Sequence, residues 1–272
     1  MSAFQTAFIG AGNMAGSILG GMLVNGFDAQ HIAASAKTEA SLTRLRGLNL
    51  RAVAADNREI AEGSDVVVLS VKPQIMRKVC EEIAPVLREN QLAVSVAAGI
   101  PADSLHRWLG GNIAVVRCMP NTPSLLGVGA SGLFAHGAVS RAQRDQATSI
   151  MQAVGVVRWV EDEALLHAVT AVSGSGPAYF FQFMEAMIAE GQRMGLDAES
   201  ARTLCAQTCM GAGRMLAEAD VDAAELRRRV CSPGGTTERA VQSFAADDIE
   251  AVVGRAMRAC YERSKEMGEE LA

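Results

Sequence analysis

The sequence predicts an α/β protein in which a doubly wound sheet is followed by an all-α domain. Over the first 160 residues, short apolar segments alternate with helix-like segments at the spacing of strand–helix–strand units. The run DVVVLSV at 65–71 is almost entirely apolar, which is typical of a parallel strand buried on both faces. After about residue 160 the strand signals stop and helical periodicity continues to the end. We therefore expect one domain over 1–160 and a helical domain over 161–272.

Local patterns place the individual elements. Strand-like segments lie at 6–9, 31–36, 50–53, 65–71, 92–96, 113–117, 131–134 and 156–159. Helical segments lie at 14–25, 39–48, 57–62, after Pro73, and then at 164–172, 178–194, 198–219, 223–231, 237–244 and 249–269. The segment 178–194 carries Phe, Met and Ile side chains on more than one face, so it needs cover from its own domain or from another subunit. We expect a homodimer formed through the helical half.

Composition excludes several classes of function. The net charge of −5 argues against a surface for nucleic acid, and an aromatic content of 4% leaves little for base stacking. The sequence has no 18-residue apolar run, so we expect no membrane span. The six cysteines form no CxxC pair and no zinc-site spacing, so we expect reduced thiols and no metal. With no leader pattern before the first strand, we expect a cytoplasmic protein.

The segment 10–15, GAGNMA, matches the dinucleotide fingerprint G-x-G-x-x-A of Rossmann domains. It follows a predicted strand and opens a predicted helix, which is the context that the motif requires. Gly10 permits a tight turn, Gly12 lets the backbone approach a pyrophosphate, and Ala15 allows close packing of helix and strand. The alternative is a turn of small residues without a ligand.

The end of the second strand indicates which dinucleotide is bound. NAD-binding domains usually carry an acidic residue about 20 residues after the fingerprint. Here the sequence reads Ser35-Ala36-Lys37-Thr38, with no carboxylate before Glu39. A hydroxyl and an ammonium group suit a 2′-phosphate, so we favour NADP(H). The alternative is that Lys37 is a solvated surface charge.

Later strand ends should line the same crevice, because ligands bind outside the carboxyl ends of strands in open α/β sheets. Lys72 and Pro73 follow the strand at 65–71, and Pro73 suits the first turn of a helix. Lys72 could lie beside cofactor or substrate, or serve structure alone. The segments 96–99 (VAAG) and 119–123 (MPNTP, with Asn121) end later strands.

The segment 231–240, CSPGGTTERA, is a second candidate site. A proline and two glycines forbid regular structure, and two threonines then open a helix. Free backbone N–H groups and hydroxyls at a helix N-terminus suit a small anion. The sequence thus pairs a cofactor site in one half with an anionic-substrate site in the other.

Five motifs together resemble the pyrroline-5-carboxylate reductase family over nearly the whole chain. They are GAGNMA at 10–15, VKP at 71–73, MPNTP at 119–123, SGSGPAY at 173–179 and SPGGTT at 232–237. The resemblance implies reduction of a cyclic imine carboxylate to L-proline with NAD(P)H. It also implies a Rossmann domain followed by an interlocked helical dimerisation domain, as a homodimer or a higher homo-oligomer such as a decamer.

The same resemblance implies roles for individual residues. Gly10, Gly12, Asn13, Met14, Ser35 and Asn57 would contact the phosphates and adenosine side of NADPH, with NADH also accepted. Val71, Lys72, Pro73, Ala97 and Ala98 would lie near the nicotinamide. Ser232, Gly234, Gly235, Thr236 and Thr237 would hold the substrate carboxylate at a subunit interface, with the Thr237 hydroxyl against the ring nitrogen as the catalytic group. Asp220 stands where some members carry a substrate-side glutamate.

The scarcity of acid–base groups separates this hypothesis from two alternatives. A protonated cyclic imine accepts hydride directly, so positioning and carboxylate binding suffice. Beyond residue 160 the chain has one lysine, Lys265, and one histidine, His167. β-Hydroxyacid dehydrogenases carry a catalytic lysine on the interdomain helix, and 178–194 has none. A nucleotide sensor without enzyme activity would have no use for the 231–240 loop.

Overall fold

The computed structural model describes residues 4–137 and 139–271. The chain divides into two compact units. One comprises Met1–Ser175 together with Cys260–Ala272, and the other comprises Gly176–Ala259. The last helix begins in the second unit and ends in the first, so the chain returns to its first unit at the end.

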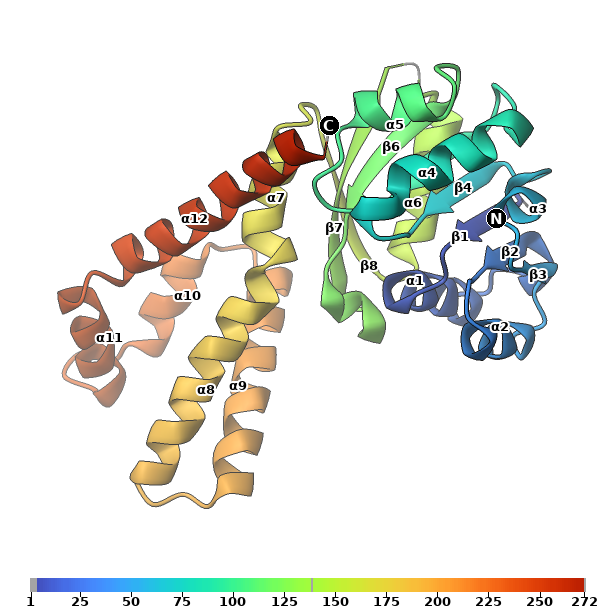
Figure 1. The fold of residues 1–272 in the computed structure, drawn as a ribbon. Helices are drawn as coiled ribbons and strands as arrows, with labels where there is room; N and C mark the ends of the chain where they lie inside the picture. The colour runs from blue at the N-terminus through green and yellow to red at the C-terminus, as the bar shows by residue number, and fades with distance from the viewer. Residues whose placement is uncertain (1–3, 138, 272) are drawn as a thin grey trace. The chain divides into compact units, whose positions relative to one another are not determined.

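An eight-stranded sheet forms the centre of the first unit (Figure 1). Its strands are β1 (Thr6–Ile9), β2 (Ile32–Ser35), β3 (Ala52–Ala54), β4 (Val66–Leu69), β5 (Leu92–Ser95), β6 (Ala114–Met119), β7 (Gly129–His136) and β8 (Gly155–Val160). Their order across the sheet is β3-β2-β1-β4-β5-β6-β7-β8. All neighbouring strands are parallel except β6 and β7, which pair antiparallel. The eight predicted strands and the doubly wound plan are thereby confirmed, with one antiparallel pair that we did not expect.

Helices cover both faces of this sheet. They are α1 (Asn13–Val24), α2 (Glu39–Arg46), α3 (Asn57–Ala61), α4 (Pro73–Ile83), α5 (Ala102–Trp108), α6 (Arg141–Gln152) and α7 (Leu165–Val169). Helices α1, α2 and α6 contribute to one hydrophobic core, and α3, α4 and α5 contribute to the other. A 3₁₀ segment, η3 (Thr122–Leu126), links β6 to β7, and a π turn (Thr170–Gly174) follows α7.

The central strands are apolar because successive side chains enter opposite cores. In β4, Val66 and Val68 belong to the core under α1, whereas Val67 and Leu69 belong to the core under α4. All four are at most 1% exposed. A strand buried in this way on both faces holds its carboxyl end in a fixed position, where the loops that follow can form a site.

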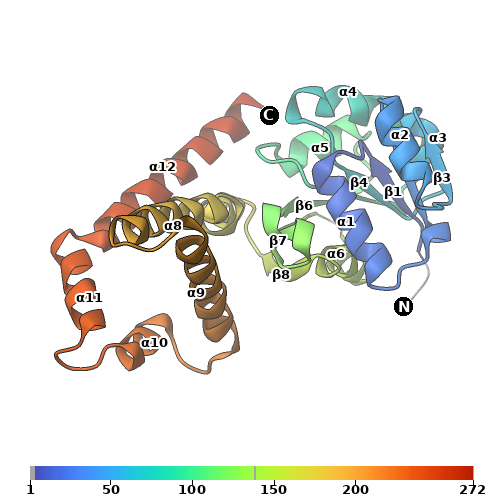
Figure 2. The same cartoon turned by 90° about the horizontal axis from the view of Figure 1, so that it is seen from below.

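The second unit is helical. Its elements are α8 (Gly176–Arg193), α9 (Ala198–Glu218), α10 (Ala223–Val230), α11 (Thr236–Ala246) and the first half of α12 (Ile249–Glu270). Helices α8 and α9 lie side by side as a hairpin in both views (Figures 1 and 2). Within the described chain, α10 and α11 bury none of their residues. Phe180 and Phe181 are 64% and 63% exposed, so in the single chain the helical unit does not itself supply all the cover predicted for 178–194.

The end of α12 packs on the first unit. Ser264 shares a hydrogen bond with His167 Nδ1 (2.8 Å), and Cys260 donates to Ser175 Oγ (3.2 Å). Leu271 packs against the core of the sheet beside Gly99. Among the described residues, no helix is long and apolar enough to cross a membrane.

Candidate functional site

The first candidate site lies where the strand order reverses, between β1 and β4. Gly10 follows β1 and adopts a φ of +83°. A Cβ on Gly10 would overlap Val71 Cγ1 on the loop after β4. Both the backbone conformation and the close approach of the two loops therefore require glycine here.

Gly12 has a different environment from Gly10. Its φ is −77°, and the nearest atom to an added Cβ is Gly10 O at 4.0 Å. Gly12 is also the N-cap of α1 and has no side chain to cap the helix, so the N–H groups at Asn13 and Met14 begin α1 without a side-chain acceptor at the cap. The open side of Gly12 and this helix start form a cradle that suits a phosphate.

Buried side chains hold the loop after β1 in place. Ser35 Oγ accepts the Gly10 N–H (3.2 Å), and Ser35 O accepts the Ala11 N–H (2.8 Å). Ser35 Oγ in turn donates to Asn57 Oδ1 (2.8 Å). Ser35 is fully buried and Asn57 is 2% exposed. The two predicted cofactor residues therefore contact each other, and Ser35 contacts the glycine loop directly.

The amide of Asn57 has a further partner that the sequence did not reveal. Asn57 Nδ2 donates to both carboxylate oxygens of Glu82, at 3.2 and 3.3 Å. Glu82 lies in α4 and is partly buried. Asn57 and Glu82 are 25 positions apart in the sequence, so no local sequence pattern could have revealed this contact.

Lys37 follows β2 at the same edge of the sheet. Its Nζ donates to Ala55 O (2.9 Å), which places the ammonium group beside the loop after β3. Lys37 is exposed, and Thr38 next to it caps α2 through Ser41 N. In this exposed position the ammonium group is accessible to a phosphate group of a ligand that binds from solvent.

The loop after β4 completes the switch point. Ser70 Oγ donates to Ile9 O (2.9 Å) and Gly10 O (3.1 Å), so the two loops are tied together. Lys72 is the exposed N-cap of α4, and Pro73 is its first residue, as predicted for its fixed φ.

Ala97 and Asn121 follow the next two strands along the chain. Ala97 N donates to Ser95 Oγ (3.3 Å), and Ala97 is partly buried. Asn121 is 8% exposed, and both ends of its amide are used inside the protein: Nδ2 donates to Ser173 O (3.0 Å), and Oδ1 accepts Ala130 N–H (2.9 Å). These bonds give Asn121 the structural role of linking the end of β6 to β7 and to the π turn.

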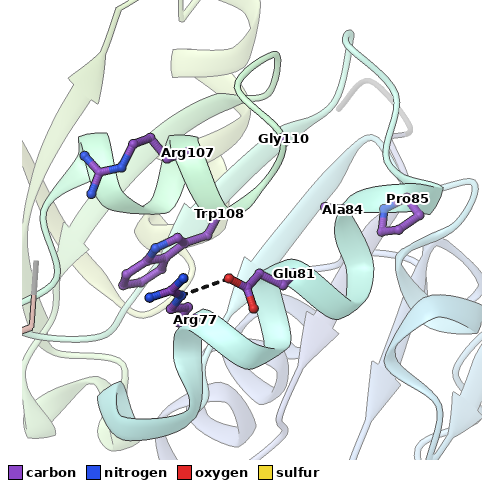
Figure 3. Close-up of a pocket in the computed structure, with 7 residues that line it drawn as sticks. All are labelled: Arg77, Glu81, Ala84, Pro85, Arg107, Trp108 and Gly110. Carbon is purple, nitrogen blue, oxygen red and sulfur yellow. Dashed lines mark hydrogen bonds and ion pairs between the residues drawn. The ribbon is translucent and has the colours of Figure 1, made fainter.

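A separate hollow lies over α4 and α5, away from these loops (Figure 3). Arg77 and Trp108 lie side by side in it, and Arg77 pairs with Glu81 at 2.8 Å. Its lining includes none of the strand-end residues described above. We therefore do not assign it to the dinucleotide.

The second candidate site begins α11 in the helical unit. Gly234 has a φ of +72°, and Gly235 is the N-cap of α11. Gly235 N donates to Ser232 O (2.9 Å), which closes the turn before Thr236 and Thr237 at the helix start. Because glycine offers no side-chain cap, the first N–H groups of this 11-residue helix suit an anion.

Glu238 restrains the same loop. Its carboxylate accepts the Gly234 N–H at 2.8 Å. Asp220, in contrast, is an exposed residue of the connection between α9 and α10. Among the residues described, no hydrogen bond or ion pair links Asp220 to the 232–237 loop.

Three other potentially reactive side chains, those of His167, Cys80 and Cys118, have structural surroundings. His167 is partly buried and bonded to Ser264, and burial together with the charge of Arg117 lowers its pKa. Burial raises the pKa of the Cys80 and Cys118 thiols to about 12, which makes them packed core residues. Over residues 4–137 and 139–271, no group of three or more His, Cys, Asp or Glu side chains could hold a metal ion.

Comparison with known families matches both halves of the chain. A family model described as pyrroline-5-carboxylate reductase dimerisation matches residues 163–267. A model described as NADP oxidoreductase, coenzyme F420-dependent, matches residues 5–99.

Individual proteins are similar over the full length. The chain is 51% identical over 271 residues to pyrroline-5-carboxylate reductase of Pseudomonas aeruginosa, covering 100% of this chain and 99% of that protein. It superposes with a TM-score of 0.94 on a pyrroline-5-carboxylate reductase from Coxiella burnetii, at 39% identity and with 98% and 99% of the two chains covered. A Plasmodium falciparum pyrroline carboxylate reductase with NADP bound gives a TM-score of 0.86 at 28% identity, with the same coverage.

Proposed function

Because this chain belongs to the pyrroline-5-carboxylate reductase family, we propose that it reduces 1-pyrroline-5-carboxylate to L-proline with NADPH. The observation that carries the proposal is the pairing of two anion-binding helix starts in one chain. One, at Gly12, lies at the switch point of the sheet, and the other, at Gly235, opens α11. The first suits a dinucleotide phosphate, and the second suits a small carboxylate.

The residues at the switch point fit NADPH. Gly12 leaves space for a pyrophosphate, the N–H groups of Asn13 and Met14 face it, and Lys37 supplies a cation for a 2′-phosphate. Ser35 and Asn57 hold the glycine loop. Val71, Lys72, Pro73 and Ala97 are proposed to line the nicotinamide end, and Asn121 to support it from the end of β6. Bound NADPH supplies the hydride that the reaction needs.

The helix start of α11 is proposed to hold the substrate. The backbone N–H groups of Thr236 and Thr237 and the hydroxyls of Ser232 and Thr236 would bind the carboxylate, since the N–H groups of Gly234 and Gly235 already donate to Glu238 and Ser232. The Thr237 hydroxyl would hydrogen-bond the ring nitrogen and thereby orient the C=N bond for attack. Because the iminium form accepts hydride without further activation, this arrangement needs no buried general acid. Asp220 stays a weaker candidate on the substrate side.

Assembly follows from the exposed helices. Two observations support a homodimer through the helical domain: the match of the dimerisation model to 163–267 and the exposed phenylalanines of α8. We place this helical domain at 161–272, after a cofactor domain at 1–160. A ring of dimers such as a decamer is the higher form to test. We place the enzyme in the cytoplasm, where its six free cysteines would stay reduced.

The test is turnover by the purified full-length protein. Loss of reduced-nicotinamide absorbance is followed with racemic 1-pyrroline-5-carboxylate, using NADPH and NADH in parallel, and the product is identified as L-proline. A 2-hydroxy acid with NADP⁺ serves as the comparison substrate. Oxidation of the hydroxy acid without reduction of the imine would refute the proposed reaction and favour a β-hydroxyacid dehydrogenase.

A further inference from the structure

A chain of hydrogen bonds runs from the glycine loop to the side of α4. It passes from Gly10 N–H to Ser35 Oγ–H and then to Asn57 Oδ1, at 3.2 and 2.8 Å. It ends where Asn57 Nδ2 meets both oxygens of Glu82. The middle of the chain is dry, because Ser35 is 0% and Asn57 is 2% exposed. Polar groups buried to this degree must satisfy one another.

The carboxylate of Glu82 determines which way the Asn57 amide points. An ionised carboxylate only accepts hydrogen bonds, so it selects the NH₂ end of the amide. A flipped amide would set its carbonyl oxygen against the carboxylate. The flip would also set the NH₂ group against Ser35, whose hydroxyl hydrogen would then lose its buried acceptor.

The orientation of Asn57 in turn fixes the Ser35 hydroxyl. With its hydrogen directed at Asn57 Oδ1, Ser35 Oγ presents a lone pair to the Gly10 N–H. This anchor matters at Gly10 because a glycine backbone is conformationally free, and the hydrogen bond helps to hold it in the left-handed turn at a φ of +83°. Each step is local, and the last one acts on the phosphate-binding loop.

We infer that Glu82, which lies outside the strand-end loops, is a positioning residue for the dinucleotide that acts through Asn57 and Ser35 on the Gly10 loop. The inference rests on the proposed use of NADPH by this site. Because the Gly10 loop faces the part shared by NADPH and NADH, Glu82 should affect both cofactors equally. It should leave turnover at saturating cofactor unchanged, because a bound cofactor itself holds the loop.

The test compares two replacements of Glu82 that are similar in size. Glu82→Gln keeps an oxygen acceptor for Asn57 Nδ2, whereas Glu82→Met fills the same space with none. We expect Glu82→Met to weaken binding of NADPH and of NADH by about tenfold each, since a hydrogen bond to a charged group is lost. Glu82→Gln should stay within about threefold of the wild type, because a neutral acceptor is weaker. The matched control is Glu81→Met, which changes the same charge on the exposed, Arg77-paired side of α4.

A double-mutant cycle then tests the route. In an Asn57→Ala background, Glu82→Met should have no further effect on NADPH affinity. Equal affinities of Glu82→Met and Glu82→Gln, or an undiminished Glu82→Met effect in the Asn57→Ala background, would overturn the inference. Cofactor binding is measured directly by titration calorimetry, so a failure of this inference can be distinguished from a failure of the proposed reaction. A wild type that binds NADPH without reducing the imine refutes the proposed reaction alone, whereas one that binds neither dinucleotide refutes both proposals.

Discussion

Replacement of the two fingerprint glycines by alanine should affect different properties, the stability of the protein at Gly10 and the affinity for NADPH at Gly12. At Gly10 an alanine must adopt a φ of +83°, and its Cβ overlaps Val71. The left-handed conformation costs about 1–2 kcal/mol, and overpacking against a side chain adds about 1–3 kcal/mol. We expect Gly10→Ala to lower the free energy of unfolding by about 2–5 kcal/mol in the absence of cofactor.

At Gly12 the same change meets no obstacle in the protein. The φ of −77° suits any residue, and the nearest atom to a Cβ lies 4.0 Å away. Alanine restricts the unfolded chain, which raises stability by about 0.4–1 kcal/mol, but it is a poorer N-cap for α1 than glycine by a similar amount. We therefore expect Gly12→Ala to leave the free energy of unfolding nearly unchanged. The methyl group nevertheless enters the space proposed for the pyrophosphate. NADPH affinity should fall by about tenfold, or 1.4 kcal/mol, and further in Gly12→Val.

Urea unfolding followed by circular dichroism, without cofactor, measures the change in the free energy of unfolding. Calorimetric titration with NADPH measures the change in cofactor affinity. All variants are compared at one protein concentration, because the unfolding of an oligomer depends on it. Normal NADPH affinity in a folded Gly12→Ala protein would refute the placement of the pyrophosphate. Equal destabilisation by the two alanines would refute the account of the turn itself.

Three further changes test other parts of the molecule. Thr237→Ala should lower kcat/KM for the imine by about tenfold, or 1.4 kcal/mol, with Thr237→Ser close to wild type, and unchanged kinetics in the alanine variant would remove the hydroxyl from the mechanism. Lys37→Glu should shift the ratio of kcat/KM values from NADPH toward NADH, and a constant ratio would mean that the 2′-phosphate is held elsewhere. Glu163→Ala should lower the free energy of unfolding by about 3 kcal/mol, because it leaves the buried guanidinium of Arg117 without the carboxylate that lies 2.6 Å from it. Glu161→Ala, at an exposed carboxylate nearby, is the control for Glu163, and equal unfolding midpoints for the two would contradict the ion-pair argument.

Local patterns in the sequence were sufficient for most of the fold. The buried strand β4 and the turn at Gly10 follow from residues within a few positions of each other, and such signals can be read from one sequence. The direction of β7 was missed, although a signal existed. Only nine residues separate Met119 from Gly129, which is too short for the helical crossover that a parallel neighbour needs.

The candidate site was harder to predict because its contacts are non-local. The family resemblance implied that Ser35 and Asn57 contact the cofactor, but nothing in the sequence joined Asn57 to Glu82 rather than to Glu81. Both glutamates belong to one amphipathic helix, and only the packing of α3 on α4 distinguishes them. The bond between Glu238 and Gly234 depends in the same way on how the loop folds back on its helix. The roles of these residues in binding and turnover stay predictions.

The path of α12 has a consequence for how the protein is made. The sheet unit contains the first 175 residues, yet its surface at Gly99 is covered by Met267 and Leu271, which follow the helical unit in the sequence. Domains generally fold in the order of their synthesis. Here the sheet can form early, but the helix that covers this loop emerges only after the whole helical unit has been translated. Completion of the cofactor-binding half is thereby delayed until α12 has followed the helical unit out of the ribosome, and a chain that stops before α12 would leave the apolar surface beside Gly99 uncovered.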